Sequence, residues 1–173
     1  DWAKVNGELD FSYNLEIMVI PALVEQEYFG VHVIPEGFEE LKVKTYAKLK
    51  ELEPQIYEQV GHHFEINSSK QLSNVLYDEM GAPKLEKYKT KDDDVFSTDK
   101  HTLKDLEGAK NADGSPTYPI VGLIQKYKKM STLLSSFYEK LPKLIEEDYL
   151  FPRYNPLRAA TGRMTCQNPN IQQ

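Results

Sequence analysis

The sequence has little of what a secreted, disulfide-linked or membrane-spanning protein needs. Its 173 residues include one cysteine, Cys166, which excludes an internal disulfide and fits a reducing compartment. The most apolar stretch, residues 17–24, is interrupted by Pro21 and falls well short of the roughly 18 residues of a membrane helix. Residues 1–4 lack the basic and apolar segments of a signal peptide. Because the first residue is not Met, we expect a piece excised from a longer, soluble protein.

Negative charge dominates the chain as a whole, but not its C-terminal third. The net charge is -6, and residues 1–83 carry six Lys against 15 Asp or Glu. Residues 120–145 carry five Lys and one Glu, and residues 151–173 carry three Arg and no acidic residue. An anionic partner is therefore expected at the C-terminal third. The alternative is that these lysines form the solvated face of an outer helix.

Apolar residues recur at helical spacing through most of the chain. The spacing predicts helices over about residues 13–29, 35–60 and 69–80, a short helix ending near residue 107, and a long helix from residue 119 to about residue 141. Pro21 and Pro54 are expected to bend the helices that contain them. Gly30, Gly61 and Gly81 are expected to end helices. The expected helix-opening residues are Pro35, Asn67-Ser68 and Ser97-Thr98.

Segments without helical spacing separate these helices. Residues 31–34 are expected to be extended, residues 84–94 to form an exposed charged loop, and residues 111–119 to form a turn-rich loop. From residue 151 to residue 166 prolines and arginines replace the helical pattern, which indicates strands or a hairpin. The predicted fold class is mainly α, with long paired helices followed by a short β segment.

The last thirteen residues combine one Arg with several amide side chains. They read Thr161-Gly162-Arg163-Met164-Thr165-Cys166-Gln167-Asn168-Pro169-Asn170-Ile171-Gln172-Gln173. Arg, Asn and Gln donate hydrogen bonds to base edges, and in the minor groove every base pair offers acceptors. A protein that holds duplex DNA of any sequence would use such side chains there. The alternative is a disordered polar tail.

This tail resembles a motif of the family A DNA polymerases, the bacterial polymerase I type. In that motif Thr-Gly-Arg-Leu-Ser-Ser is followed, after two variable residues, by Pro-Asn-Leu-Gln-Asn. The resemblance implies that Arg163, Asn170 and Gln172 contact the minor groove of the primer–template duplex near its growing end. Thr165 keeps one of the two serine hydroxyls, whereas Cys166 replaces the other and leaves a phosphate contact there in doubt. Gln173 stands where the family usually has Asn.

The resemblance extends over almost the whole chain. Residues 64–72, Phe-Glu-Ile-Asn-Ser-Ser-Lys-Gln-Leu, resemble the opening of a thumb helix, and residues 119–142 resemble the long thumb helix. Lys89-Thr90-Lys91 and Phe96-Ser97-Thr98 resemble the thumb tip. The implied organisation is an approach helix over residues 1–34, a thumb subdomain over residues 35–148, and the first strands of the palm over residues 149–173, in a parent that would be α+β.

Phosphate contacts are expected where helices begin. Helices that open at Ser68 and at Ser97-Thr98 present free backbone N–H groups and a positive dipole end. Lys70, Lys89 and Lys91 lie close to these openings in the sequence. In the long helix, the resemblance assigns a basic position to Lys128, whereas Thr132 stands at a second position that is usually basic. The alternative for each helix start is an ordinary cap without a ligand.

No catalytic residue and no metal site are expected within these residues. Asp92-Asp93-Asp94 could be read as a site for a hard cation. Consecutive carboxylates cannot all face one ion without a dedicated loop, so we interpret the run as a solvated turn. His62 and His63 lack partners at ligand spacing, and Cys166 has no His or acidic residue at a nucleophile's spacing.

The resemblance implies that the parent is a DNA-directed DNA polymerase, a nucleotidyltransferase of DNA replication. Its two Mg²⁺ ions and the dNTP would be held by palm aspartates and a fingers helix beyond Gln173, so the 173 residues alone are expected to bind duplex and polymerise nothing. The expected partners are primer–template DNA and the remaining palm and fingers, without a membrane. The implied location is the cytoplasm of a bacterial or phage-infected cell, or an organelle. The alternative is a non-catalytic interaction or regulatory module derived from a polymerase thumb.

Overall fold

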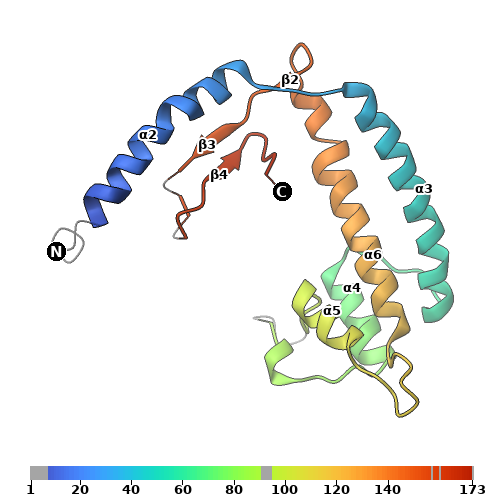
Figure 1. Ribbon diagram of the computed structural model, residues 1–173. Helices are drawn as coiled ribbons and strands as arrows, with labels where there is room; N and C mark the ends of the chain where they lie inside the picture. The colour runs from blue at the N-terminus through green and yellow to red at the C-terminus, as the bar shows by residue number, and fades with distance from the viewer. Residues whose placement is uncertain (1–7, 91–94, 157, 160, 173) are drawn as a thin grey trace. The chain divides into compact units, whose positions relative to one another are not determined.

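A computed structural model describes residues 8–90, 95–156, 158–159 and 161–172, which are mainly helical (Figure 1). Two antiparallel sheets of two strands each complete the described part. The predicted fold class is confirmed. The elements are α2 (Glu8–Phe29), β1 (Val31–His32), α3 (Pro35–Val60), α4 (Ser69–Ser73), the π-helix η1 (Asn74–Glu79), the 3₁₀-helix η2 (Glu86–Tyr88), α5 (Lys100–Glu107), α6 (Pro119–Leu133), the π-helix η3 (Leu134–Tyr138), the 3₁₀-helix η4 (Leu141–Leu144), β2 (Tyr149–Leu150), β3 (Arg153–Asn155) and β4 (Thr165–Gln167).

The chain divides into two compact units. The first comprises Asp1–Glu39 together with Glu139–Gln173, and the second comprises Glu40–Tyr138. The second unit holds most of α3 and all of α4, α5 and α6, whereas the first holds α2 and both small sheets. Each unit is described separately below.

The second unit has one hydrophobic core between its helices. On α6, Ile120, Ile124 and Tyr127 are buried, as their spacing of four and three residues predicts. The same helical spacing carries Leu49 and Ile56 of α3 into this core. The buried core residues are Leu49, Ile56, Ile66, Leu72, Leu76, Tyr77, Ala82, Tyr88, Leu103, Leu106, Ile120, Val121, Ile124 and Tyr127.

Helix α3 has the predicted ends. It begins at Pro35, where a missing N–H costs no helical hydrogen bond, and it ends at Val60. Gly61 follows with φ +88°, and its N–H donates to the Tyr57 carbonyl at 2.7 Å, which is the expected left-handed cap. The helix continues through Pro54 without ending.

Two predicted helices change from α to π geometry along their length. The helix expected over residues 69–80 consists of α4 followed by η1, and η3 continues α6 to Tyr138. The N–H of Met80 donates to the carbonyl of Val75, five residues earlier, which is the π-helical pattern. Helix existence was therefore predicted correctly, but this change of hydrogen bonding was not.

The stretch expected to be an exposed charged loop, residues 84–94, is described as far as residue 90, and up to there it is only partly exposed. Tyr88, at the end of η2, is 5% exposed and belongs to the core. Its ring lies near that of Tyr77, with centroids 6.4 Å apart. The prediction of a wholly exposed loop was wrong at this residue, because one aromatic side chain is drawn out of a charged stretch into the core.

In the first unit, the turn after α2 brings β1 against β2. Val31 pairs with Leu150 and His32 with Tyr149. Gly30 makes the turn with φ +69°, and a Cβ there would lie 2.9 Å from both the Leu150 carbonyl oxygen and the Phe151 ring. Glycine is required for both reasons, since other residues rarely adopt this φ and none has room.

Helix α2 leaves most of its apolar residues exposed. Leu23 is buried, whereas Ile17, Ile20 and Val24, which share its helical spacing, are 44–59% exposed. The helix runs through Pro21 without ending. No described helix is long and apolar enough to cross a membrane.

Candidate nucleic-acid interface

The C-terminal hairpin, β3 with β4, arranges its side chains on two faces. Arg153 pairs with Gln167, Tyr154 with Cys166, and Asn155 with Thr165, so the expected hairpin is confirmed. Since successive side chains in a strand point to opposite faces, Tyr154 and Cys166 share one face and the remaining four residues share the other. Cys166 is 5% exposed, and its thiol donates to the Pro169 carbonyl at 3.3 Å. The apolar side of the hairpin is thus covered, and a polar side is left.

Arg163 stands just before β4 on the approach to this polar face. Gly162, with φ +71°, donates its N–H to the Ala159 carbonyl at 3.0 Å and so turns the chain into β4. The Arg163 side chain is exposed and makes no hydrogen bond or ion pair with any residue that the structure describes. Arg158, which lies in the same loop, instead donates to Gln167 Oε1 at 2.6 Å. The Arg163 donors are therefore not satisfied by any residue that the structure describes.

The other predicted groove readers lie in the same segment. Thr165 Oγ1 donates to the Asn155 carbonyl at 3.2 Å, so this hydroxyl holds the hairpin together. Asn170 Oδ1 accepts from the Gln172 N–H at 3.1 Å, which leaves the Asn170 side-chain amide nitrogen as a donor. Gln172 is exposed. Gln173 lies outside the described residues.

In the second unit, a basic groove lies between α5 and α6. It has a volume of about 580 Å³, and it carries the charges of Lys100, Lys128, Lys129 and Asp99. Its other lining residues are Thr98, Leu103, Gln125, Thr132 and Leu133. Three lysines against one aspartate make this groove suited to an anionic partner.

Lys128 is anchored at the bottom of this groove. Its ammonium donates to the Thr98 carbonyl at 3.2 Å and is only partly exposed. Burial lowers the pKa of Lys128, and the nearby Asp99 carboxylate opposes that shift. Lys128 thus ties α6 to the residues before α5, in addition to any contact with a ligand.

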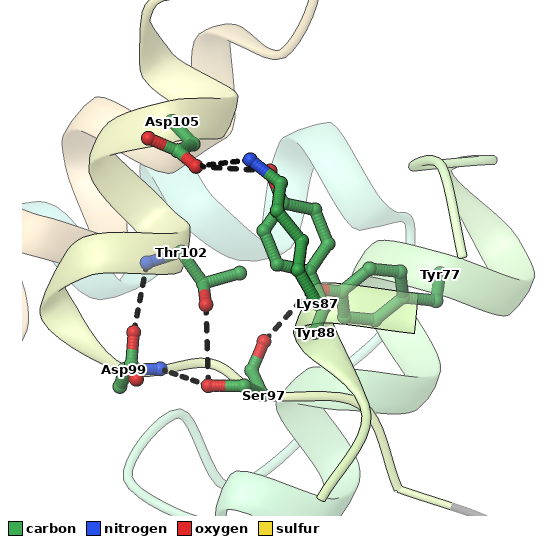
Figure 2. Close-up of polar contacts among 7 residues, drawn as sticks. All are labelled: Tyr77, Lys87, Tyr88, Ser97, Asp99, Thr102 and Asp105. Atoms are coloured by element: carbon green, nitrogen blue, oxygen red, sulfur yellow. Dashed lines mark hydrogen bonds and ion pairs between the residues drawn. The ribbon is translucent and has the colours of Figure 1, made fainter. Parts of the chain in front are cut away.

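The start of α5 differs from the prediction. Asp99, rather than Ser97-Thr98, is the N-cap, because its Oδ1 accepts from the Thr102 N–H at 2.8 Å (Figure 2). This hydrogen bond lowers the pKa of Asp99. Ser97 Oγ accepts from the Asp99 N–H and from the Thr102 hydroxyl, both at 3.2 Å. Because the Asp99 carboxylate already occupies the start of α5, the backbone N–H groups there are not a free phosphate site. Any attraction of this groove for phosphate comes from its lysines.

The start of α4 has the predicted cap. Ser68 Oγ accepts from the Gln71 N–H at 3.4 Å. Lys70 is exposed, and it lines a second groove with two histidines, where Asp78 and Glu79 place two carboxylates near this one lysine. The five-residue α4 gives only a short dipole, so Lys70 is the stronger of these two phosphate candidates.

Lys89 lies on the remaining predicted segment. Its ammonium is 2.8 Å from Glu86 Oε1, whose side chain is 85% exposed, and Lys89 itself remains accessible. Lys91 and the acidic run Asp92-Asp93-Asp94 lie outside the described residues. Among the residues that are described, no three His, Cys, Asp or Glu side chains gather in a way that could hold a metal ion.

The sequence argument missed part of the basic groove. Gln125, Lys128, Lys129 and Thr132 follow one another at the i, i+3, i+4, i+7 spacing of a single helix face. This polar stripe on one helix face, together with Lys100, was the pattern in the sequence that could have predicted the groove. Of the predicted residues, the structure brings Thr98 and Lys128 together there.

Comparison with known proteins identifies the family. The model of DNA polymerase family A matches residues 35–173. The chain belongs to DNA polymerase family A. It is 32% identical to DNA polymerase I of Bacillus subtilis over 169 residues, which is 96% of this chain and 18% of that protein. It is 30% identical to the thermostable DNA polymerase I of Thermus aquaticus over 99% of this chain and 20% of that protein.

A solved family A structure has a similar fold. The polymerase domain of Pol1 from M. smegmatis, described as a complex with DNA primer–template and dNTP, matches 91% of this chain with a TM-score of 0.74 and 25% identity. This chain covers 26% of that one. It therefore spans about a fifth of each of the two bacterial polymerases named above and about a quarter of this solved chain.

Proposed function

We propose that this chain is the part of a DNA-directed DNA polymerase that grips the primer–template duplex. The parent carries out template-dependent DNA synthesis by nucleotidyl transfer. Residues 1–34 form the approach to the thumb, residues 35–148 the thumb, and residues 149–173 the first strands of the palm. Family membership and the DNA-bound state of the M. smegmatis relative support this proposal.

The observation that carries the proposal is the exposed Arg163 side chain without a partner among the described residues. A buried or internally paired arginine would be structural, whereas this one follows a glycine turn and precedes the polar face of a hairpin. Its guanidinium matches the acceptors that both A·T and G·C pairs present in the minor groove. Asn170 and Gln172 add amide donors from the same segment.

The second unit contributes phosphate contacts, which are independent of base sequence. The groove between α5 and α6 offers Lys100 and Lys129 at its rim and Lys128 at its base. Lys70 and Lys89 add charge from other parts of the unit's surface, and Lys91 remains a predicted contact outside the described residues. Such contacts release counterions, so the affinity should fall with rising salt.

The Mg²⁺ ions and the dNTP belong to the parent's reaction and are not assigned to residues of this chain. In the family resemblance, the aspartates that hold the metals follow the Gln172 motif. These 173 residues alone should therefore bind duplex and incorporate no nucleotide. Measurable incorporation by them would overturn this part of the proposal.

The test is to titrate a labelled primer–template duplex with the full-length protein and to measure binding by fluorescence anisotropy at two salt concentrations. Arg163→Ala should weaken binding about tenfold or more, the loss expected for a charge-assisted hydrogen bond. Arg158→Ala is the matched control, since it removes the same charge from the same loop but from an arginine that is already paired. Equal effects of the two variants would contradict a specific role for Arg163. No binding at low salt would favour a non-catalytic interaction module.

A further inference from the structure

Helix α5 is tied at both ends to the hairpin stem formed by residues 88–90 and 95–97 (Figure 2). Within this stem the Ser97 N–H donates to the Tyr88 carbonyl at 2.6 Å, and Lys89 pairs with Phe96. At the start of α5, Ser97 Oγ accepts from Thr102 and from the Asp99 N–H. This first tie links the stem to the beginning of the helix.

The second tie lies in the last turn of α5, at Asp105. Its Oδ2 accepts from the Lys87 ammonium at 2.7 Å and from the Tyr88 hydroxyl at 3.2 Å. Asp105 stands six residues after Asp99, which is about 9 Å along a helix. Two ties this far apart fix the direction of the stem as well as its position. A tie at Ser97 alone would leave Lys87 and the Tyr88 hydroxyl without a contact to α5.

The core holds the rest of the stem. Tyr77 and Tyr88 are 3% and 5% exposed, and the Tyr77 hydroxyl donates to the Ser97 carbonyl at 2.8 Å. The Phe96 N–H donates to Oγ of the buried Ser73 at 3.0 Å. Asp105, whose side chain is about half exposed, is therefore the accessible end of an otherwise buried arrangement.

The two lysines beside Tyr88 have different surroundings. Lys87 is held by Asp105, which sits on a helix and is itself fixed by a second contact with Tyr88. Lys89 faces Glu86, one helical turn away and largely exposed, so water screens this pair. Lys87 thus contacts both the Asp105 carboxylate and the Tyr88 ring, whereas Lys89 has one exposed partner that a phosphate can replace.

We propose that Asp105 is a positioning residue for DNA binding: through Lys87 and Tyr88 it orients the stem so that Lys89 and the basic groove meet the same DNA backbone. This inference rests on the proposed function. Asp105 would then strengthen DNA binding, although its side chain is acidic and lies near the proposed path of a polyanion. Simple charge repulsion predicts the opposite sign.

The sign of the effect provides the test. In the full-length protein, Asp105→Ala should weaken primer–template binding about threefold to tenfold, the range that ordering of one or two side chains costs. The slope of log Kd against log salt should stay unchanged, since no phosphate contact is removed. Lys89→Ala should instead lower that slope by about 0.9. Binding by Asp105→Ala that is as tight as, or tighter than, that of the unaltered protein would overturn the proposal.

Glu58→Ala is the matched control, because it removes the same charge from an exposed side chain of α3 and leaves the Lys87 and Tyr88 contacts in place. Its binding should be unchanged or tighter. Amide hydrogen exchange at Ser97 separates this proposal from the proposed function. Exchange there should be faster in Asp105→Ala alone. If the unaltered protein binds no duplex, the proposed function fails, and unchanged Ser97 exchange in Asp105→Ala would then reject the tie as well.

Discussion

The Tyr127 hydroxyl donates to Oε1 of Glu53 at 3.1 Å, which joins α6 to α3 across 74 residues of sequence. Burial and then the Glu53 carboxylate raise the pKa of Tyr127. Glu53 also faces Lys50, with its Oε2 3.5 Å from the Lys50 ammonium. This contact connects the two longest helices of the second unit.

Tyr127→Phe should lower the free energy of unfolding by about 1 kcal/mol, because it removes one hydrogen bond while Glu53 keeps Lys50. In a thermal melt this corresponds to a decrease of about 2–4 °C for a protein of this size. Tyr28→Phe, at a hydroxyl of an exposed side chain, should leave the melt unchanged. If Tyr127→Phe were as stable as the unaltered protein, water would replace this hydrogen bond at no cost in the free energy of unfolding.

Lys129→Gln should weaken duplex binding without affecting stability. Its side chain is exposed at the rim of the basic groove, so the substitution removes one charge and no internal contact. The slope of log Kd against log salt should decrease by about 0.9, the value for one phosphate contact. An unchanged slope would place the DNA backbone away from this groove. Lys48→Gln, on α3, is a control for loss of one exposed charge.

Lys128 should titrate below the ordinary lysine range of about 10.4, because burial disfavours its charged form. The measurement is a carbon-13 NMR titration of dimethylated lysines. Asp99→Asn should move the pKa of Lys128 lower still, since it removes the carboxylate that favours the ammonium. Asn is also a good N-cap, so α5 should remain intact in this variant. An upward shift would contradict the assigned environment.

His62 should stabilise the fold at low pH more than at high pH. The Glu79 carboxylate, 2.8 Å from Nε2, and then the His63 carbonyl raise the pKa of His62 above 6.5. A group whose folded pKa is raised contributes stability that is fully present below its unfolded pKa and is lost as pH rises through the folded one. Denaturation curves on either side of pH 6.5 test this. Glu79→Gln should reduce the difference and move the His62 NMR midpoint down, while the contact with the His63 carbonyl remains.

Helix ends were predicted correctly where one residue type suits the required backbone geometry much better than the others. Pro35 and Gly61 bound α3 because each offers a backbone geometry that other residues adopt poorly. The cap of α5 was misplaced because Ser97, Thr98 and Asp99 are all good caps in succession, and only the folded backbone decides which side chain reaches Thr102.

Features that depend on distant partners could not be predicted. Tyr88 is a single aromatic residue in a charged stretch, and its burial depends on Tyr77 and on Asp105 of α5. The apolar spacing of α2 predicts a buried stripe, yet Ile17 and Val24 find no cover among the described residues. For the proposed interface, the motif predicts a contact by Arg163, whereas the proposed role of Asp105 depends on contacts between segments that no local pattern relates.

Gly30 and Gly61 both have positive φ, but they should differ sharply under random mutagenesis. Around Gly61 nothing lies within 4 Å of an added Cβ, so Asn, which tolerates this backbone region, should survive selection there. At Gly30 the Leu150 carbonyl and the Phe151 ring occupy that space, so even alanine should be eliminated. In such a library Gly30 should therefore be invariant, because only glycine leaves room for the pairing of β1 with β2.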